Sequence, residues 1–101
     1  MYTKEEKEMT LDEVWEKIEG SQGETFRTFR GLDFTYTVKG GCVYISRKDK
    51  EVTFSSVKMA YEEAVKLNCI VPGPKKLKCF GASYLYPIFL RIGFIKADRT
   101  E

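Results

Sequence analysis

The two adjacent glycines at positions 40–41 constrain the fold of this chain more than any other feature. Both can adopt the positive φ that a two-residue hairpin turn requires, so they predict a tight turn between two strands. That turn sets the register, with Val38 opposite Val43 and Tyr36 opposite Ile45. One face of the hairpin is then apolar and the other is mixed, as expected for an antiparallel sheet with one solvated side. The apolar face consists of Phe34, Tyr36, Val38, Val43 and Ile45.

The preceding segment ETFRTF, residues 24–29, is predicted to add a third strand, because β-branched and aromatic residues favour extended structure. Its connection through Arg30 and Gly31 has two possible forms. A two-residue turn would place Phe26 on the outer face of the sheet, whereas a three-residue turn with Gly31 left-handed would place it on the core face. We favour the second form, because it buries Phe26 beside Tyr36.

Two amphipathic segments flank this sheet. Thr10 is suited to cap a helix over residues 11–19, whose first turn is acidic and therefore complements the helix dipole. Thr53 is suited to cap a second helix over residues 54–67, in which apolar residues recur at helical spacing. Both helices are predicted to place their apolar faces against the core.

A third helix is predicted near the C-terminus. Pro74 favours a short helical turn in the connecting segment, because proline suits the first helical position. Ser83 is expected to cap a helix over residues 84–92, with Gly93 in the left-handed position that follows it. Phe94 would then pack back on this helix.

These elements predict one domain of the α+β class. It consists of an N-terminal helix, a three-stranded antiparallel sheet built from two hairpins, and two to three helices on one face of the sheet. The 101 residues suit a single domain, and 43% of them are hydrophobic, which is enough for a core. We expect the domain to span residues 10–97, with flexible tails at residues 1–9 and 98–101.

The sequence favours a cytoplasmic protein. The first ten residues are charged and lack the apolar run of a secretory signal. The three cysteines are an odd number and are expected to be free thiols in a reducing compartment. The longest apolar stretch is shorter than the roughly 20 residues that a membrane-spanning helix needs, so no membrane partner is predicted.

No catalytic, metal or cofactor site is predicted. The chain has no His, which removes the commonest general base and metal ligand and excludes Ser-His and Cys-His pairs. The cysteines, at positions 42, 69 and 79, match no regular zinc spacing. We therefore expect a protein that is not an enzyme.

The net charge of +2 hides an uneven distribution along the chain. Residues 1–24 carry three Lys against eight Asp and Glu, whereas residues 25–101 carry 14 Lys and Arg against seven Asp and Glu. Residues 64–97 contain no acidic residue and six basic ones. Such asymmetry attracts anionic partners, unless the acidic N-terminal helix lies over the basic half and neutralises it.

The basic residues predict a surface that binds phosphates. Lys and Arg hold nucleic-acid backbones, and single strands also stack on exposed aromatic side chains, for which Tyr44 is a candidate. Arg27 and Arg30 lie in or near the first strand and add to the positive charge. We therefore hypothesise a small regulatory or accessory protein that binds nucleic acid or another anionic macromolecule. Its expected phosphate contacts are Arg47, Lys48, Lys50, Lys75, Lys76 and Lys78.

The C-terminal helix suggests an alternative function. Residues 82–95 contain a single charged residue, and a helix that is apolar all round is either buried or meets a partner. The chain would then be a protein-interaction module or a homodimer. The side chains expected to meet the partner are Tyr84, Tyr86, Leu90 and Phe94.

Two outlines resemble known nucleic-acid-binding families. The order helix, three strands, helix over residues 10–67 resembles the topology of double-stranded-RNA-binding domains, but the basic start of that family's final helix is missing. The segment at 77–93 resembles a helix-turn-helix, yet the positions that would face bases are apolar and cannot read hydrogen-bonding edges. Neither resemblance indicates a family.

Overall fold

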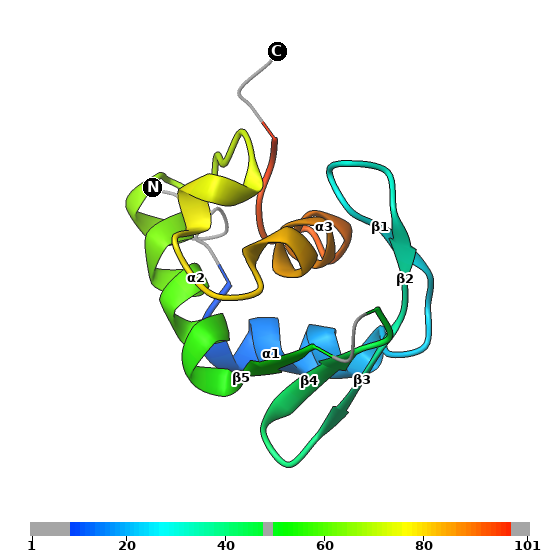
Figure 1. Ribbon diagram of the computed structural model, residues 1–101. Coiled ribbons are helices and arrows are strands. Elements are labelled where there is room, and N and C mark those ends of the chain that lie inside the picture. Colours follow the sequence, from blue (N-terminus) through cyan, green and yellow to red (C-terminus); the bar gives the residue numbers. More distant parts are fainter. Residues whose placement is uncertain (1–8, 48–49, 98–101) are drawn as a thin grey trace.

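The computed structural model describes residues 9–47 and 50–97, and the predicted tails at 1–8 and 98–101 lie outside these residues. The described chain is of the α+β class (Figure 1). Its elements, in order, are α1 (Leu11–Gly20), β1 (Phe26–Arg27), β2 (Asp33–Phe34), β3 (Tyr36–Lys39), β4 (Cys42–Ile45), β5 (Glu51–Thr53), α2 (Phe54–Lys66), the 3₁₀ helix η2 (Pro74–Leu77) and α3 (Ala82–Arg91).

The strands form two antiparallel sheets, a hairpin of β1 and β2 and a three-stranded sheet in the order β3-β4-β5. The Gly-Gly turn has the predicted register, with Val38 opposite Val43 and Tyr36 opposite Ile45. The third strand of the larger sheet is β5, which the sequence analysis missed, and not the segment 24–29. The chain leaves one sheet for the other at Thr35, whose N–H donates to the side chain of Ser46.

The turn between β1 and β2 is the favoured three-residue form. Thr28 N–H donates to the carbonyl of Leu32 over 2.9 Å, and Gly31 has a left-handed φ of 87°. This register places Phe26 on the core face, where its ring centroid lies 5.4 Å from that of Tyr36. Phe26 is buried, as predicted.

The two predicted threonine caps are present. The Thr10 side chain accepts from the Glu13 N–H and the Glu13 carboxylate accepts from the Thr10 N–H, which makes a capping box at α1. The Thr53 side chain accepts from the Ser56 N–H at the start of α2. Both caps satisfy backbone donors that a helix start leaves free.

The start of α3 differs from the prediction. The helix begins at Ala82 with Gly81 as its N-cap residue, so Ser83 lies inside the first turn and is not the cap. Gly81 has a φ of 82°, and a Cβ on it would lie 2.6 Å from the Val52 side chain. A glycine is therefore needed where the chain turns tightly against β5. At the other end, Gly93 is left-handed, and Phe94 packs on Phe89 as predicted.

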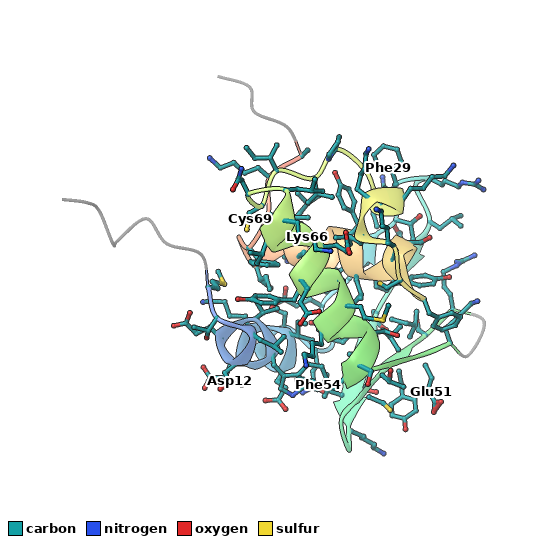
Figure 2. All side chains as sticks on the ribbon, turned by 90° about the vertical axis from the view of Figure 1, so that its left-hand side faces the viewer. Asp12, Phe29, Glu51, Phe54, Lys66 and Cys69 are labelled. Atoms are coloured by element: carbon teal, nitrogen blue, oxygen red, sulfur yellow. The ribbon has the colours of Figure 1, made fainter. Side chains whose placement is uncertain are left out.

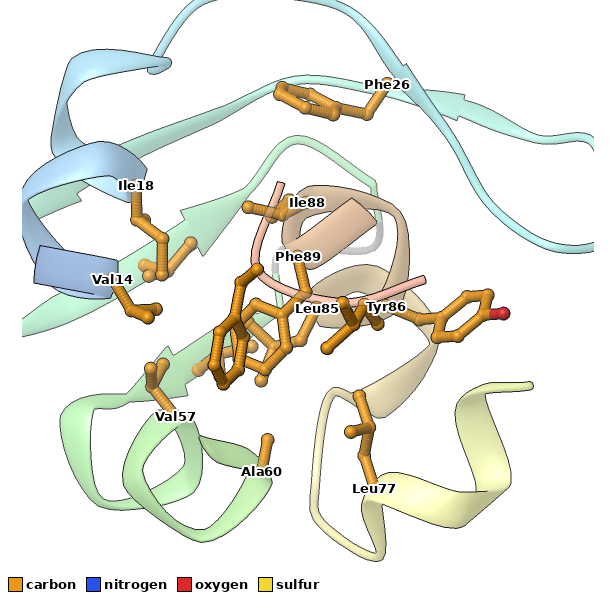
Figure 3. Close-up of a cluster of buried hydrophobic side chains, with 14 of the residues drawn as sticks. Val14, Ile18, Phe26, Val57, Ala60, Leu77, Leu85, Tyr86, Ile88 and Phe89 are labelled. Atoms are coloured by element: carbon orange, nitrogen blue, oxygen red, sulfur yellow. The ribbon is translucent and has the colours of Figure 1, made fainter. Parts of the chain in front are cut away.

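Helix α3 lies at the centre of the domain, between the β1–β2 hairpin and α2 (Figure 1). Figure 3 shows its side chains Leu85, Ile88 and Phe89 within the core, and all three are fully buried. The segment that follows α2 is hydrogen-bonded to the segment that follows α3, because Val71 N–H donates to the Lys96 carbonyl over 2.8 Å. Met9, the last residue of the predicted N-terminal tail, is half-buried and accepts a hydrogen bond from the Tyr61 hydroxyl.

None of the helices in the part of the chain that the structure describes is long and apolar enough to cross a membrane.

Candidate nucleic-acid interface

An open groove of about 1150 Å³ lies between two segments that are far apart in the sequence. One wall is the turn of the β1–β2 hairpin, residues 28–32. The other wall is the segment 72–79, which includes η2, and the first turn of α3 contributes residues 82–84. We call this feature the basic groove, because of the charges described next.

Four basic side chains line the basic groove, and all four are exposed. Among the described residues, none of those that line it is acidic, and none of the four cations forms an ion pair with a described carboxylate. Such a concave surface with charges of one sign attracts anions. The four residues are Arg30, Lys75, Lys76 and Lys78.

Local backbone structure positions these cations. Pro74 starts η2, and the tight 3₁₀ turn brings Lys75 and Lys76 to the surface in succession. Lys78 follows with a left-handed φ of 52°, which turns the chain away from η2 towards α3. On the opposite wall, the left-handed Gly31 closes the hairpin turn that carries Arg30.

Exposed apolar side chains accompany these charges. Phe29 lines the groove at the hairpin turn and is 67% exposed, and Leu32 beside it is 44% exposed. The rings of Phe29 and Tyr86 form a T-shaped pair, with centroids 5.9 Å apart and an interplanar angle of 78°. Tyr84, which is half-buried, also lines the groove and packs edge-to-face on Phe34.

A second exposed aromatic side chain lies just outside the groove lining. Phe80 is 57% exposed and follows Lys78 by two residues. The Lys50 ammonium lies 5.2 Å from the centroid of the Phe80 ring, in a cation–π contact. This contact brings the loop after β4 next to the segment that forms one wall of the basic groove.

The structure brings some of the predicted phosphate contacts together and separates others. Lys75, Lys76 and Lys78 share the groove, and Lys50 lies at the neighbouring Phe80. Arg47 is half-buried and its guanidinium is directed at the backbone carbonyl of Asp33, 3.5 Å away, so it does not join them. Lys48 lies outside the described residues.

The sequence also indicated Arg27, Arg30 and Tyr44 as possible contacts, and the structure places them differently. Arg30 lines the groove, although its sequence neighbours gave no reason to group it with the distant lysines. Arg27 is instead paired with Asp33, at 3.0 Å. Tyr44 is exposed but is not among the residues that line the groove.

The acidic helix α1 does not cover the basic groove. It contributes no residue to the groove lining, and it lies at the opposite end of the molecule from the hairpin turn (Figure 1). Figure 2 likewise shows Asp12 of α1 and Phe29 of the turn at opposite corners. The acidic residues of α1 therefore do not neutralise the cations of the basic groove.

The alternative interaction surface is largely occupied by the chain itself. Tyr86 and Phe94 are 2% and 4% exposed, and the Tyr86 hydroxyl donates to the Val71 carbonyl over 2.8 Å. Tyr84 and Leu90 are half-buried against the core. The apolar character of α3 is explained by its central position. The same burial argues against the helix-turn-helix resemblance, because the positions that would face bases, 85, 88 and 89, lie inside the core.

The three cysteines, at positions 42, 69 and 79, are half-buried. None of them belongs to a cluster of potential metal ligands within residues 9–47 and 50–97. Cys79 lines the basic groove, where burial raises the pKa of its thiol to about 11. It is thus a neutral thiol near pH 7, and behaves as a small apolar side chain.

No protein-family model, curated protein or solved structure matches this chain at a significant level.

Proposed function

We propose that this chain is a small accessory protein of the cytoplasm, without catalytic activity, that binds nucleic acid in the basic groove. The observation that supports the proposal is the convergence of Arg30 with Lys75, Lys76 and Lys78 around one open surface that α1 leaves uncovered. Cations that form no ion pair with a described carboxylate keep their full charge for an external anion.

The chemistry of phosphate binding fits these side chains. A nucleic-acid backbone is a row of regularly spaced negative charges, and each phosphate that a Lys or Arg neutralises releases a condensed counterion. Four exposed cations on two facing walls can neutralise several consecutive phosphates. The same number of scattered surface lysines would each meet the polymer alone.

A salt titration tests the proposal. Binding of a fluorescein-labelled oligonucleotide is followed by anisotropy, and the logarithm of the binding constant is plotted against the logarithm of the salt concentration. The test variant replaces Lys75, Lys76 and Lys78 by Gln. The control variant replaces Lys39 and Lys58, which are exposed and lie outside the groove lining, by Gln.

The proposal predicts that the binding constant of the unmodified chain falls steeply with salt concentration. The magnitude of the slope should be smaller by about 2 for the triple variant, because each lost phosphate contact reduces that magnitude by roughly 0.7–0.9. The control variant is expected to retain most of the slope. Absence of binding at low salt would contradict the proposal, and so would equal slopes for the triple variant and the unmodified chain.

A further inference from the structure

We infer that the basic groove takes single-stranded nucleic acid, with Phe29 as a platform on which a base stacks. The inference rests on the proposed function and adds to it the class of nucleic acid. It is carried by the exposed aromatic side chains that accompany the cations, which phosphate binding alone does not explain.

Phe29 is exposed in a way that folding does not require. The three-residue turn needs Gly31 to be left-handed, but it sets no demand for a large apolar side chain two positions earlier. Yet Phe29 leaves 67% of its surface in water. An exposed ring of this size beside a row of cations indicates a contact with something outside the chain.

The Phe29 ring is also held in place. It forms a T-shaped contact with the Tyr86 ring, and Tyr86 is itself fixed by burial and by its hydrogen bond to the Val71 carbonyl. A ring that is anchored by one contact and otherwise largely exposed loses little freedom when a base stacks on it, so most of the stacking energy is retained.

Phe80 provides a second exposed ring, next in sequence to the segment 72–79. Lys50 lies over this ring, so a phosphate drawn to Lys50 would bring its own base near Phe80. Aromatic and cationic side chains therefore occur together at two places, as Phe29 with Arg30 on the hairpin wall and as Phe80 with Lys50 just outside the groove lining. This combination is typical of surfaces that bind single strands, where bases stack and phosphates pair.

A duplex fits this arrangement less well. In a duplex the faces of the bases are stacked on one another, so only phosphates and base edges reach a protein. Exposed rings would then find no base face to contact. Duplex readers usually insert a protruding helix into the major groove, whereas here the helix with that outline, α3, is buried.

The experiment compares labelled probes at low salt: oligo(U) and oligo(dT) of about 12 nucleotides, within the site sizes of single-strand binders, and a mixed-sequence duplex of the same length. Each is titrated with the unmodified chain, with Phe29→Leu and with Phe29→Trp. Phe54→Leu is the matched control, because Phe54 is also partly exposed and lies outside the groove lining. Circular dichroism checks that every variant is folded.

The inference predicts tighter binding of the single strands than of the duplex. Phe29→Leu keeps an apolar side chain but removes the aromatic face, so it should weaken single-strand binding by about ten-fold, in the lower part of the range for one stacked base. Its salt slope should stay unchanged, because no phosphate contact is lost. Phe29→Trp should retain affinity and show fluorescence quenching when a strand binds. Comparison of oligo(U) with oligo(dT) then distinguishes RNA from DNA.

Two outcomes would overturn the inference while leaving the proposed function standing. One is salt-dependent binding in which the duplex is bound as tightly as the single strands. The other is loss of binding in the triple lysine variant together with no effect of Phe29→Leu beyond that of Phe54→Leu. If no probe binds at low salt, the proposed function and the inference fail together, and an acidic polypeptide becomes the partner to test.

Discussion

The hydroxyl of Tyr36 donates a hydrogen bond of 2.6 Å to the backbone carbonyl of Ile18. The bond joins β3 to the last turn of α1, where the Ile18 carbonyl also accepts a longer bond of 3.2 Å from the Ser21 N–H. Tyr36 is 1% exposed, so the bond is shielded from water. Together with the packing of Val14 and Ile18 in the core, it holds the acidic helix against the sheet, away from the basic groove.

Removal of this hydroxyl is expected to destabilise the fold. Tyr36→Phe keeps the ring but removes the shorter of the two hydrogen bonds that the Ile18 carbonyl accepts, which costs about 1 kcal/mol. Urea unfolding followed by far-ultraviolet circular dichroism measures the change. Tyr44→Phe is the control, since an exposed hydroxyl should alter the free energy of unfolding by less than about 0.5 kcal/mol. Equal values for the two variants would show that the bond does not stabilise the fold.

Alkaline pH is expected to act through the same side chain. Burial raises the pKa of Tyr36 well above the ordinary tyrosine value of about 10. The folded state therefore keeps the proton that the unfolded state releases above about pH 10. The contribution of Tyr36 is complete below that pH and is lost above it, by up to about 1.4 kcal/mol per pH unit. Urea unfolding on either side of about pH 10 should show a shallower decline for Tyr36→Phe than for the unmodified chain, and parallel declines would contradict the account.

The close approach of Gly81 to Val52 predicts a second sensitive position. Gly81→Ala forces a left-handed Ala and places its Cβ against the Val52 side chain, so we expect a loss of about 3 kcal/mol. Gly93→Ala isolates the conformational part, because Gly93 has a similar φ and no atom within 4 Å of the added Cβ. Its expected cost is about 1 kcal/mol. Thermal and urea unfolding of both variants give the comparison, and equal losses would mean that the contact with Val52 is relieved without cost.

Substitution of Lys78 distinguishes an effect on binding from an effect on the stability of the fold. It adopts a left-handed conformation that glycine tolerates better, so Lys78→Gly should stabilise the fold by about 0.5 kcal/mol while removing a groove cation. Lys76→Gly removes a cation from the helical turn and should destabilise by about 1 kcal/mol. Both are expected to weaken nucleic-acid binding to a similar extent. If only the destabilised variant lost affinity, the loss would result from impaired folding and not from the missing charge.

Local chemistry explains which parts of the fold could be predicted from the sequence. The Gly-Gly turn at 40–41 and the caps Thr10 and Thr53 act on neighbouring residues, and all three have the expected geometry. Strand β5 was missed because its three residues, with Val52 between Glu51 and Thr53, show no pattern of their own. They become a strand only through pairing with β4.

The basic groove depends on contacts that no local pattern contains. Lys75, Lys76 and Lys78 were expected to act together, but Arg30 and Phe29 join them only because the β1–β2 hairpin packs beside α3. The sequence likewise left open whether α3 is buried or meets a partner. The surrounding elements decide this, since α2, η2 and the hairpin cover it from several sides.

The location of binding is the central claim, and chemical-shift mapping tests it most directly. Amide spectra of the ¹⁵N-labelled chain are recorded with increasing oligo(U). The account predicts that the largest shifts occur at residues 28–32 and 75–80, with little change in α1. Shifts confined to α1 or α2, or spread evenly over the surface, would contradict it.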